Sequence, residues 1–210
     1  MLSGINVLCH SSIRIAKDKV IYIDPFKVTE EYNDADIIFC THSHYDHFSE
    51  ADILKVKKED SILVIPSDCL DKAKELGFST NNILVVEPNK KYKVLGMNFE
   101  TVPAYNLEKD FHKQEYNWVG YVLEINDITY YIAGDTDLIP EAKSVNCDVA
   151  FLPIGGTYTM NAKDAAALAN IIEPQIVIPI HYGTIVGSKE DENKFKQELN
   201  ENIECVIMLK

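Results

Sequence analysis

Four potential metal ligands lie within six positions of this chain, in the run Thr41-His42-Ser43-His44-Tyr45-Asp46-His47. Imidazole nitrogens and carboxylate oxygens are side-chain groups that hold zinc and similar divalent ions in proteins. A lone histidine is more often structural than a ligand. Three histidines and an aspartate this close together have few structural explanations, because buried imidazoles and carboxylates are destabilising unless they are paired. The run therefore predicts a metal site.

The segments on either side of this run are suited to holding its ligands in place. Residues 37–40 predict a short buried strand, and residues 49–54 predict the capped start of a helix. Ligands on a strand-to-helix loop can converge on one point while the flanking elements hold them still. His42 and His44, two apart in an extended segment, can point the same way, and Asp46 and His47 can point toward a second ion.

The rest of the chain alternates short apolar runs with amphipathic segments. Strands are predicted over 5–9, 13–16, 20–23, 63–65, 119–125, 128–132, 148–152, 175–179 and 203–208, and a β-meander over 83–86, 91–94 and 97–102. Helices are predicted near 50–57, 68–76, 162–172 and 190–200, and Asn126-Asp127 predicts a tight hairpin turn. This order predicts an α/β protein with two mixed sheets packed face to face and helices outside, in a single domain over 1–210.

Composition excludes several classes of function. The net charge is −13 and Arg14 is the only arginine, whereas nucleic-acid binders need basic surface to neutralise phosphates. No run approaches the roughly 20 apolar residues of a membrane-spanning helix, and the start lacks the pattern of a secretory signal. The five cysteines are scattered and form no Cys-x-x-Cys pair, which favours reduced thiols in a cytoplasmic protein.

The His-x-His-x-Asp-His pattern resembles the signature of the metallo-β-lactamase fold superfamily. The downstream segments resemble its branch of ascorbate-phosphate lactonase-like metal-dependent hydrolases, which is related to the N-acyl-phosphatidylethanolamine phospholipase D enzymes. The resemblance covers nearly the whole chain. The other segments that carry it are His10-Ser11-Ser12-Ile13-Arg14-Ile15, Ile23-Asp24-Pro25, Val102-Pro103-Ala104-Tyr105, Ala133-Gly134-Asp135-Thr136 and Pro179-Ile180-His181-Tyr182-Gly183.

This resemblance implies a four-layer αβ/βα sandwich with a metal site at one edge, and it implies further ligands. Asp135 ends a predicted strand after a glycine, and by resemblance it bridges two ions, although a turn or helix-cap aspartate is common there. His181 follows a predicted apolar strand and matches the last histidine of the family. Asp24 is expected to orient a ligand imidazole, and His10 is expected to be a hydrogen-bonded structural residue.

The chain departs from the family at the third ligand of the first metal. Related enzymes commonly carry a histidine where this chain has Asn106, and an amide oxygen is a poor zinc ligand. His112, six residues later, is the spare histidine downstream. Two alternatives remain open: His112 replaces the missing ligand, or it contacts substrate or acts as a general acid. The Gly155-Gly156 loop is expected to line the pocket, with Tyr158 and Tyr182 as candidate donors.

These features predict a metal-dependent hydrolase with one or two divalent ions, most often zinc in such ligand sets, with manganese, iron and nickel as alternatives. A metal-bound hydroxide would attack a small ester, lactone or phosphodiester, and Asp46 would orient the water or bind the second ion. The positive charge of bound metal would suit a small anionic substrate. A di-iron redox protein and a non-catalytic metal-binding module are the alternatives, and His44 speaks against the first because the di-iron relatives usually carry a carboxylate there.

Overall fold

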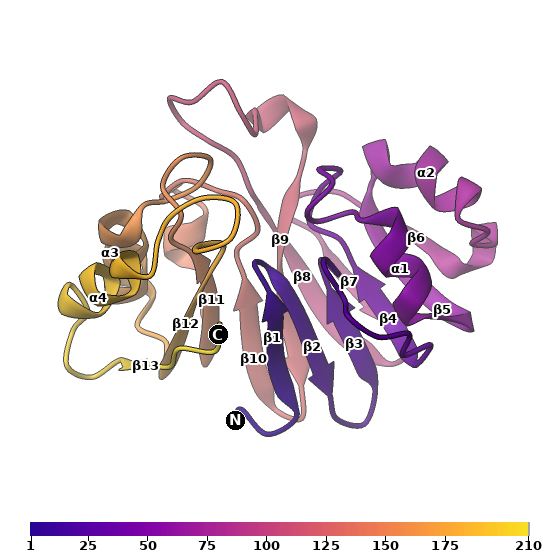
Figure 1. Ribbon diagram of the computed structural model, residues 1–210, viewed down its shortest axis with the longest axis horizontal. Coiled ribbons are helices and arrows are strands. Elements are labelled where there is room, and N and C mark those ends of the chain that lie inside the picture. The colour runs from indigo at the N-terminus through magenta and orange to yellow at the C-terminus, as the bar shows by residue number, and fades with distance from the viewer. Residues whose placement is uncertain (210) are drawn as a thin grey trace. The chain divides into compact units, whose positions relative to one another are not determined.

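The computed structural model describes residues 1–209 and divides into two compact units (Figure 1). We call them the N-terminal unit, which is built from Leu2–Glu87, and the C-terminal unit, which is built from Pro88–Met208. Each unit carries one mixed β-sheet with its own helices. The predicted α/β class with two mixed sheets is therefore confirmed, whereas the single domain over 1–210 stays a prediction.

The sheet of the N-terminal unit has six strands in the order β1-β2-β3-β4-β5-β6 within the described residues. The first three strands are antiparallel, and β3 to β6 are parallel. Their bounds are Ile5–Cys9, Ser12–Ala16, Val20–Ile23, Ala35–Phe39, Lys57–Pro66 and Ile83–Val86. Two helices, α1 (Glu50–Val56) and α2 (Leu70–Glu75), and two short 3₁₀ turns, η1 (Ser67–Cys69) and η2 (Thr80–Asn82), complete the unit.

Both helices bury apolar residues against one face of this sheet. Ile53 and Val56 of α1 and Ala73 of α2 belong to the same buried cluster as Ile38 and Leu63 of the sheet. Ser49 occupies the N-cap position of α1 as predicted, but its hydroxyl does not cap the backbone. It donates instead to the Asp52 carboxylate at 2.8 Å. Burial of the apolar face, rather than a side-chain cap, therefore holds α1 in place.

The sheet of the C-terminal unit has seven strands in the order β13-β12-β11-β10-β9-β8-β7 within the described residues. Strands β10 to β13 are parallel, and β7 to β10 are antiparallel. Their bounds are Lys91–Val94, Met97–Pro103, Val119–Ile125, Ile128–Ile132, Val149–Pro153, Ile176–Ile180 and Glu204–Cys205 for β7 to β13. Helices α3 (Ala162–Ile172) and α4 (Glu190–Gln197) lie side by side, and two 3₁₀ turns, η3 (Gln114–Tyr116) and η4 (Ala142–Ser144), join other elements (Figure 1).

Most predicted elements are confirmed, and two differences are informative. The predicted meander over 83–86, 91–94 and 97–102 is wrong at its first strand, because β6 pairs in parallel with β5 and only β7 and β8 form a hairpin. The predicted strand over 203–208 pairs only at Glu204–Cys205. The turn at Asn126 and Asp127 is confirmed, and both residues take the left-handed φ values, 52° and 60°, that a tight hairpin turn needs.

In each sheet, strands that run in the same direction bring their carboxyl ends to one edge. In the N-terminal unit these are β1 and β3 to β6, and β1, β3 and β4 are followed by His10, Asp24 and the run from Thr41 to His47. In the C-terminal unit they are β8 and β10 to β13. Side chains at the carboxyl ends of such strands commonly form ligand sites. No described helix is long and apolar enough to cross a membrane.

Candidate metal centre

The N-terminal unit holds the predicted run in a tight turn between β4 and α1. The His44 carbonyl accepts hydrogen bonds from the backbone N–H groups of His47, at 3.0 Å, and Phe48, at 2.7 Å. Phe48 is buried in the core of the unit and anchors the end of the turn. His42 and His47 are almost completely buried, at 1% and 0% exposure, and Asp46 is buried at 8%. The turn therefore holds His42, Asp46 and His47 largely out of water, whereas His44 is half-buried.

Asp24, at the end of β3, fixes the orientation of His47. One carboxylate oxygen, Oδ1, accepts a hydrogen bond from the Thr41 backbone N–H at 2.7 Å. The other, Oδ2, lies 2.7 Å from His47 Nδ1. Because the carboxylate accepts the Nδ1 proton, the Nε2 lone pair of His47 is left for a metal ion, as in carboxylate–histidine–metal arrangements. The predicted orienting role of Asp24 matches this geometry.

Thr41 extends this arrangement to His42. Its hydroxyl donates to Asp24 Oδ2 at 2.8 Å, and its oxygen lies 3.0 Å from His42 Nδ1. The single hydroxyl proton is used by Asp24, so the oxygen accepts from His42 Nδ1–H, which leaves the Nε2 lone pair of His42 as a ligand. Complete burial raises the pKa of Asp24, and its hydrogen bonds with His47 and Thr41 oppose that rise by favouring the carboxylate.

The predicted ligands of the run form one compact group. His42 Nε2 lies 3.1 Å from His44 Nδ1. The ring of His47 lies 4.0 Å from that of His42, centroid to centroid. His47 Nε2 lies 3.7 Å from Asp46 Oδ2. A donor set of imidazole nitrogens and one carboxylate suits zinc and neighbouring divalent metals, so the residues present fit the predicted ion.

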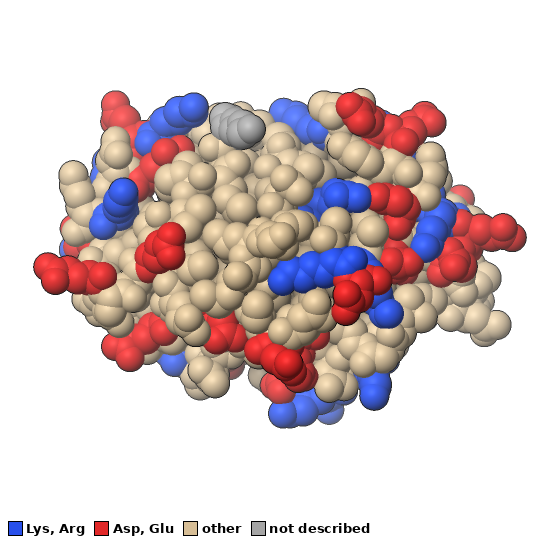
Figure 2. Space-filling model, turned by 90° about the horizontal axis from the view of Figure 1, so that it is seen from below, with Lys and Arg blue, Asp and Glu red and all other residues tan. Residues whose placement is uncertain are grey.

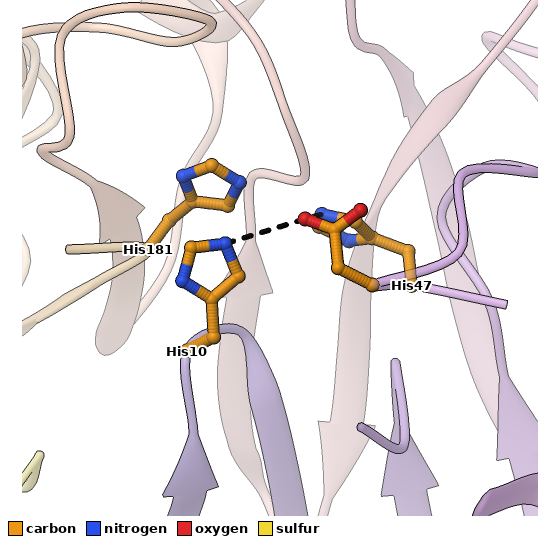
Figure 3. A group of neighbouring side chains, drawn as sticks. His10, His47 and His181 are labelled. Atoms are coloured by element: carbon orange, nitrogen blue, oxygen red, sulfur yellow. Dashed lines mark ion pairs between the residues drawn. The ribbon is translucent and has the colours of Figure 1, made fainter. Parts of the chain in front are cut away.

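His10 joins this group although it was predicted to be structural. It lies in the turn between β1 and β2, is completely buried, and has a left-handed φ of 55°. Its Nε2 lies 3.4 Å from Asp46 Oδ2, the contact drawn as a dashed line in Figure 3. The ligand atoms of His10, Asp46 and His47 all lie within 4.8 Å of one another. The sequence signal that could have found it is a histidine in a tight turn between two apolar strands.

The C-terminal unit brings its three predicted site residues together around one carboxylate. Asp135 follows β10 after Gly134, whose φ of 67° turns the chain there. Asp135 Oδ2 lies 3.0 Å from His181 Nε2 and 3.3 Å from His112 Nε2. All three side chains are at most 3% exposed. A carboxylate oxygen between two imidazole nitrogens is the donor chemistry expected of residues that bind a divalent ion.

The loop between β8 and β9 positions His112. The His112 carbonyl accepts a hydrogen bond from the Asn106 N–H at 2.8 Å, and its φ of 50° is left-handed. Its ring packs edge-on against Trp118 at 5.5 Å. The Nδ2 group of Asn106 donates to the Tyr158 carbonyl at 2.8 Å and lies 3.2 Å from His112 Nδ1. Asn106 thus contacts the ring nitrogen of His112 that faces away from Asp135, which is the place of an orienting residue.

Gly155 allows His181 to take its place after β12. A Cβ atom at Gly155 would lie 2.3 Å from the His181 carbonyl oxygen and 3.4 Å from His181 Nδ1. Real Cβ atoms do not approach a backbone oxygen this closely, so only glycine fits without displacing His181. The expectation that the Gly155-Gly156 loop lines the pocket stays a prediction. His181 itself has a left-handed φ of 59°.

An aromatic pair borders His112, and one member, Phe111, is exposed while the other, Tyr158, is half-buried. Phe111 is 48% exposed, and its ring meets the edge of the Tyr158 ring at 4.7 Å. Lys109 binds both the Asp137 carboxylate and the Thr159 carbonyl, so it ties this loop to the segment that contains Tyr158. Tyr158, predicted as a candidate donor, therefore presents its ring beside Phe111.

Comparison with known proteins identifies the family. The family described as a beta-lactamase superfamily domain matches residues 4–181. The chain belongs to this superfamily. Within it, the chain is 30% identical to a UPF0173 metal-dependent hydrolase of Thermococcus onnurineus, over 97% of this chain and 95% of the relative. It is 32% identical to a UPF0173 metal-dependent hydrolase of Lysinibacillus sphaericus, over 95% of this chain and 93% of the relative.

Among solved structures, one designated a metal-dependent hydrolase from Parabacteroides distasonis is 32% identical to this chain. The match covers 98% of this chain and 93% of that one, with a TM-score of 0.84. These relatives confirm the predicted family, and they place the chain with the UPF0173 metal-dependent hydrolases of the beta-lactamase superfamily. The narrower resemblance to the lactonase-like branch stays a prediction.

Proposed function

We propose that the protein hydrolyses a small ester, lactone or phosphodiester with one or two bound divalent ions, and that zinc is the native metal. One observation carries the proposal: Asp24 and Thr41 hold the Nδ1 atoms of His47 and His42, so both Nε2 atoms are left to bind metal. This degree of orientation is typical of ligand histidines and is not needed for histidines that merely pack.

The residues of both clusters have defined parts in this proposal. Zinc held by these residues would supply a nucleophile at neutral pH, because binding to zinc can lower the pKa of water from 15.7 to about 7. His42, His44 and His47 supply nitrogen ligands. Asp46, which retains 8% exposure, binds metal or orients the attacking water. The C-terminal unit carries a group of its own, in which Asp135, His181 and His112 would supply donors and the Asp135 carboxylate lies beside both imidazoles.

Charge favours a small molecule over a nucleic acid as substrate. The chain carries a net charge of −13. On the face drawn in Figure 2, acidic and basic side chains of the described residues are interspersed and form no continuous basic patch. A nuclease would need basic surface to neutralise phosphates along a strand. The charge of bound metal still suits a small substrate with one anionic group.

The aromatic pair beside His112 supports a substrate with an apolar part. The exposed ring of Phe111, next to His112 in the sequence, packs against the half-buried ring of Tyr158. Burial of apolar substrate surface there would contribute about 25 cal/mol for each Å² removed from water. We therefore expect turnover to rise with the length of an acyl or alkyl group in a homologous substrate series, and Phe111→Ala to flatten that dependence.

Elemental analysis followed by an activity panel tests the proposal. Protein expressed without added metal is analysed, stripped with a chelator, and restored separately with zinc, manganese, iron and nickel. We expect hydrolysis of an ester, lactone or phosphodiester only after restoration, and its loss in His42→Ala and His44→Ala. Tight stoichiometric metal without hydrolysis of any class would favour the non-catalytic module. Iron-dependent oxygen uptake would favour the redox alternative.

A further inference from the structure

We propose that His10 is a metal ligand, so that His10, Asp46 and His47 form a two-histidine, one-carboxylate set carried entirely by the N-terminal unit. The inference rests on the proposed metal-dependent function and adds a ligand from outside the His-x-His-x-Asp-His run. All three residues lie at the carboxyl ends of β1 and β4, which run in the same direction.

The distances within this set are those of ligand atoms around an ion. A tetrahedral ion with bonds of about 2.0–2.1 Å keeps its ligand atoms about 3.3–3.4 Å apart. Asp46 Oδ2 lies 3.4 Å from His10 Nε2 and 3.7 Å from His47 Nε2. An N–H···O hydrogen bond has a donor–acceptor distance of about 2.7–3.2 Å. The spacing of His10 and Asp46 is longer than that, whereas His47 Nδ1 and Asp24 Oδ2, at 2.7 Å, form a true hydrogen bond.

The backbone at His10 points to the same conclusion. Its φ of 55° is left-handed, a conformation that costs roughly 1–2 kcal/mol for a residue with a side chain. Glycine would fit this turn without that cost. A completely buried imidazole on a strained residue, aimed at the carboxylate of a predicted ligand, is accounted for by a role of the side chain itself.

The free energy of burial distinguishes two roles for His10, that of a metal ligand and that of an ion-pair partner of Asp46. A protonated His10 paired with Asp46 would place two charges in a nearly dry site, where desolvation offsets much of their attraction. A neutral His10 that shares a divalent ion with Asp46 and His47 satisfies all three groups with one bound charge.

Nuclear magnetic resonance of the histidine rings tests the proposal directly. The chain has only six histidines, so protein labelled with nitrogen-15 in those rings gives a readable spectrum. The metal-free protein is titrated with cadmium-113, whose nuclear spin splits the signal of each nitrogen bound to it. With signals assigned through bonds to the backbone, we expect both His10 Nε2 and His47 Nε2 to shift and split.

A chelator competition with variants supplies the second readout. We expect His10→Gln to bind zinc at least tenfold more weakly than the unaltered protein. Ser12→Ala is the matched control, because Ser12 is buried at the start of β2, two residues after His10, and its hydroxyl accepts from the Phe26 N–H at 3.2 Å. It should retain full affinity. The spectrum of the unaltered protein decides the matter even where His10→Gln fails to fold.

The outcomes distinguish this inference from the proposed function. Splitting at His47 with an unchanged His10 ring would overturn the ligand role of His10 and leave the metal site intact. Splitting at no histidine would overturn both the ligand role and the metal-dependent function. Splitting at His10 and His47 together, with weaker binding in His10→Gln, would establish His10 as a ligand.

Discussion

The variant Asp24→Asn should prevent a histidine from binding metal, although every predicted ligand residue is still present. Asp24 Oδ1 accepts from the Thr41 N–H, and Oδ2 accepts from the Thr41 hydroxyl and from His47 Nδ1. In Asp24→Asn, the amide oxygen can keep the backbone donor, so the NH₂ group faces the other two. His47 then escapes a clash of donors by moving its proton from Nδ1 to Nε2, which is the nitrogen needed by the metal.

The expected loss of metal affinity in Asp24→Asn follows from the number of contacts that change. Loss of an orienting partner typically weakens metal binding by about 10–100-fold, which corresponds to about 1.4–2.7 kcal/mol. We expect the upper part of this range, because one substitution disturbs two predicted ligands, His47 directly and His42 through Thr41. Two charge-assisted hydrogen bonds are also lost, so unfolding should become easier by about 2–4 kcal/mol.

Asp52→Asn is the matched control for this experiment. Asp52 is also a buried carboxylate of the N-terminal unit, and it accepts from two backbone N–H groups, those of Lys27 at 2.8 Å and Val28 at 3.0 Å. Its other donors are the Ser49 hydroxyl and the Lys55 ammonium, and neither residue is a predicted ligand. Zinc affinity is measured by chelator competition, and stability by urea unfolding of the metal-free protein.

We expect both variants to lose stability and only Asp24→Asn to lose affinity. A folded Asp24→Asn protein with unchanged zinc affinity would refute the reasoning, because it would show that the Nδ1 contact does not set the state of His47.

Three further predictions concern other contacts. Gly155→Ala should lower zinc content while leaving the helix content near normal, because its Cβ would lie 2.3 Å from the His181 carbonyl and force that residue away; elemental analysis and circular dichroism check this. His112→Ala should lower the number of bound ions, whereas Asn106→Ala should keep that number and weaken affinity about tenfold, as measured by titration with zinc. Burial would raise the pKa of Asp52, but its hydrogen bonds lower that pKa overall. Asp52→Ala should therefore destabilise the protein most above pH about 4, and progressively less as the pH falls, as measured by urea unfolding.

Each of these has a result that contradicts it. Gly156→Ala is the control for Gly155→Ala. Its only strain is a left-handed φ of 81°, because the new Cβ would lie at an ordinary contact distance of 3.5 Å from Asn161. Equal loss of zinc in both variants would show that any substitution in this loop disturbs the site, and would contradict the prediction. Full metal content in His112→Ala with reduced turnover would favour a general acid over a ligand. A destabilisation by Asp52→Ala that stays constant from pH 7 to pH 3 would contradict the lowered pKa.

The positions of strands could be predicted where the local sequence pattern determines them. The strands with which they pair could not. The bounds of β1 (Ile5–Cys9), β9 (Val119–Ile125) and α3 (Ala162–Ile172) match the predicted ranges, because their apolar periodicity is unambiguous. The pairing of β6 with β5 was missed, since a four-residue apolar strand does not encode which sheet it joins. The extension of β5 back to Lys57 was missed because its start is a charged run, stabilised by Lys58 binding Asp36.

The candidate site was predictable to the extent that its ligands are adjacent in the sequence. The run from His42 to His47 stands out because its residue types are metal ligands and all four lie within six positions. His112 was found as a spare histidine, but its contact with Asn106 depends on a loop closed by a backbone hydrogen bond that no pattern specifies. His10 was assigned to structure because it stands alone in the sequence, and only the fold brings it to Asp46.

Backbone strain ties these histidines to their chemistry. Three of the six histidines, His10, His112 and His181, have left-handed φ values between 50° and 59°, a region that holds only a few per cent of residues other than glycine. Glycine would relieve about 1 kcal/mol or more at each position. All three imidazoles are buried and belong to the candidate clusters. The left-handed backbone restricts where each ring can point. That restriction is what a metal ligand requires, because ions accept donors only within narrow distances and angles.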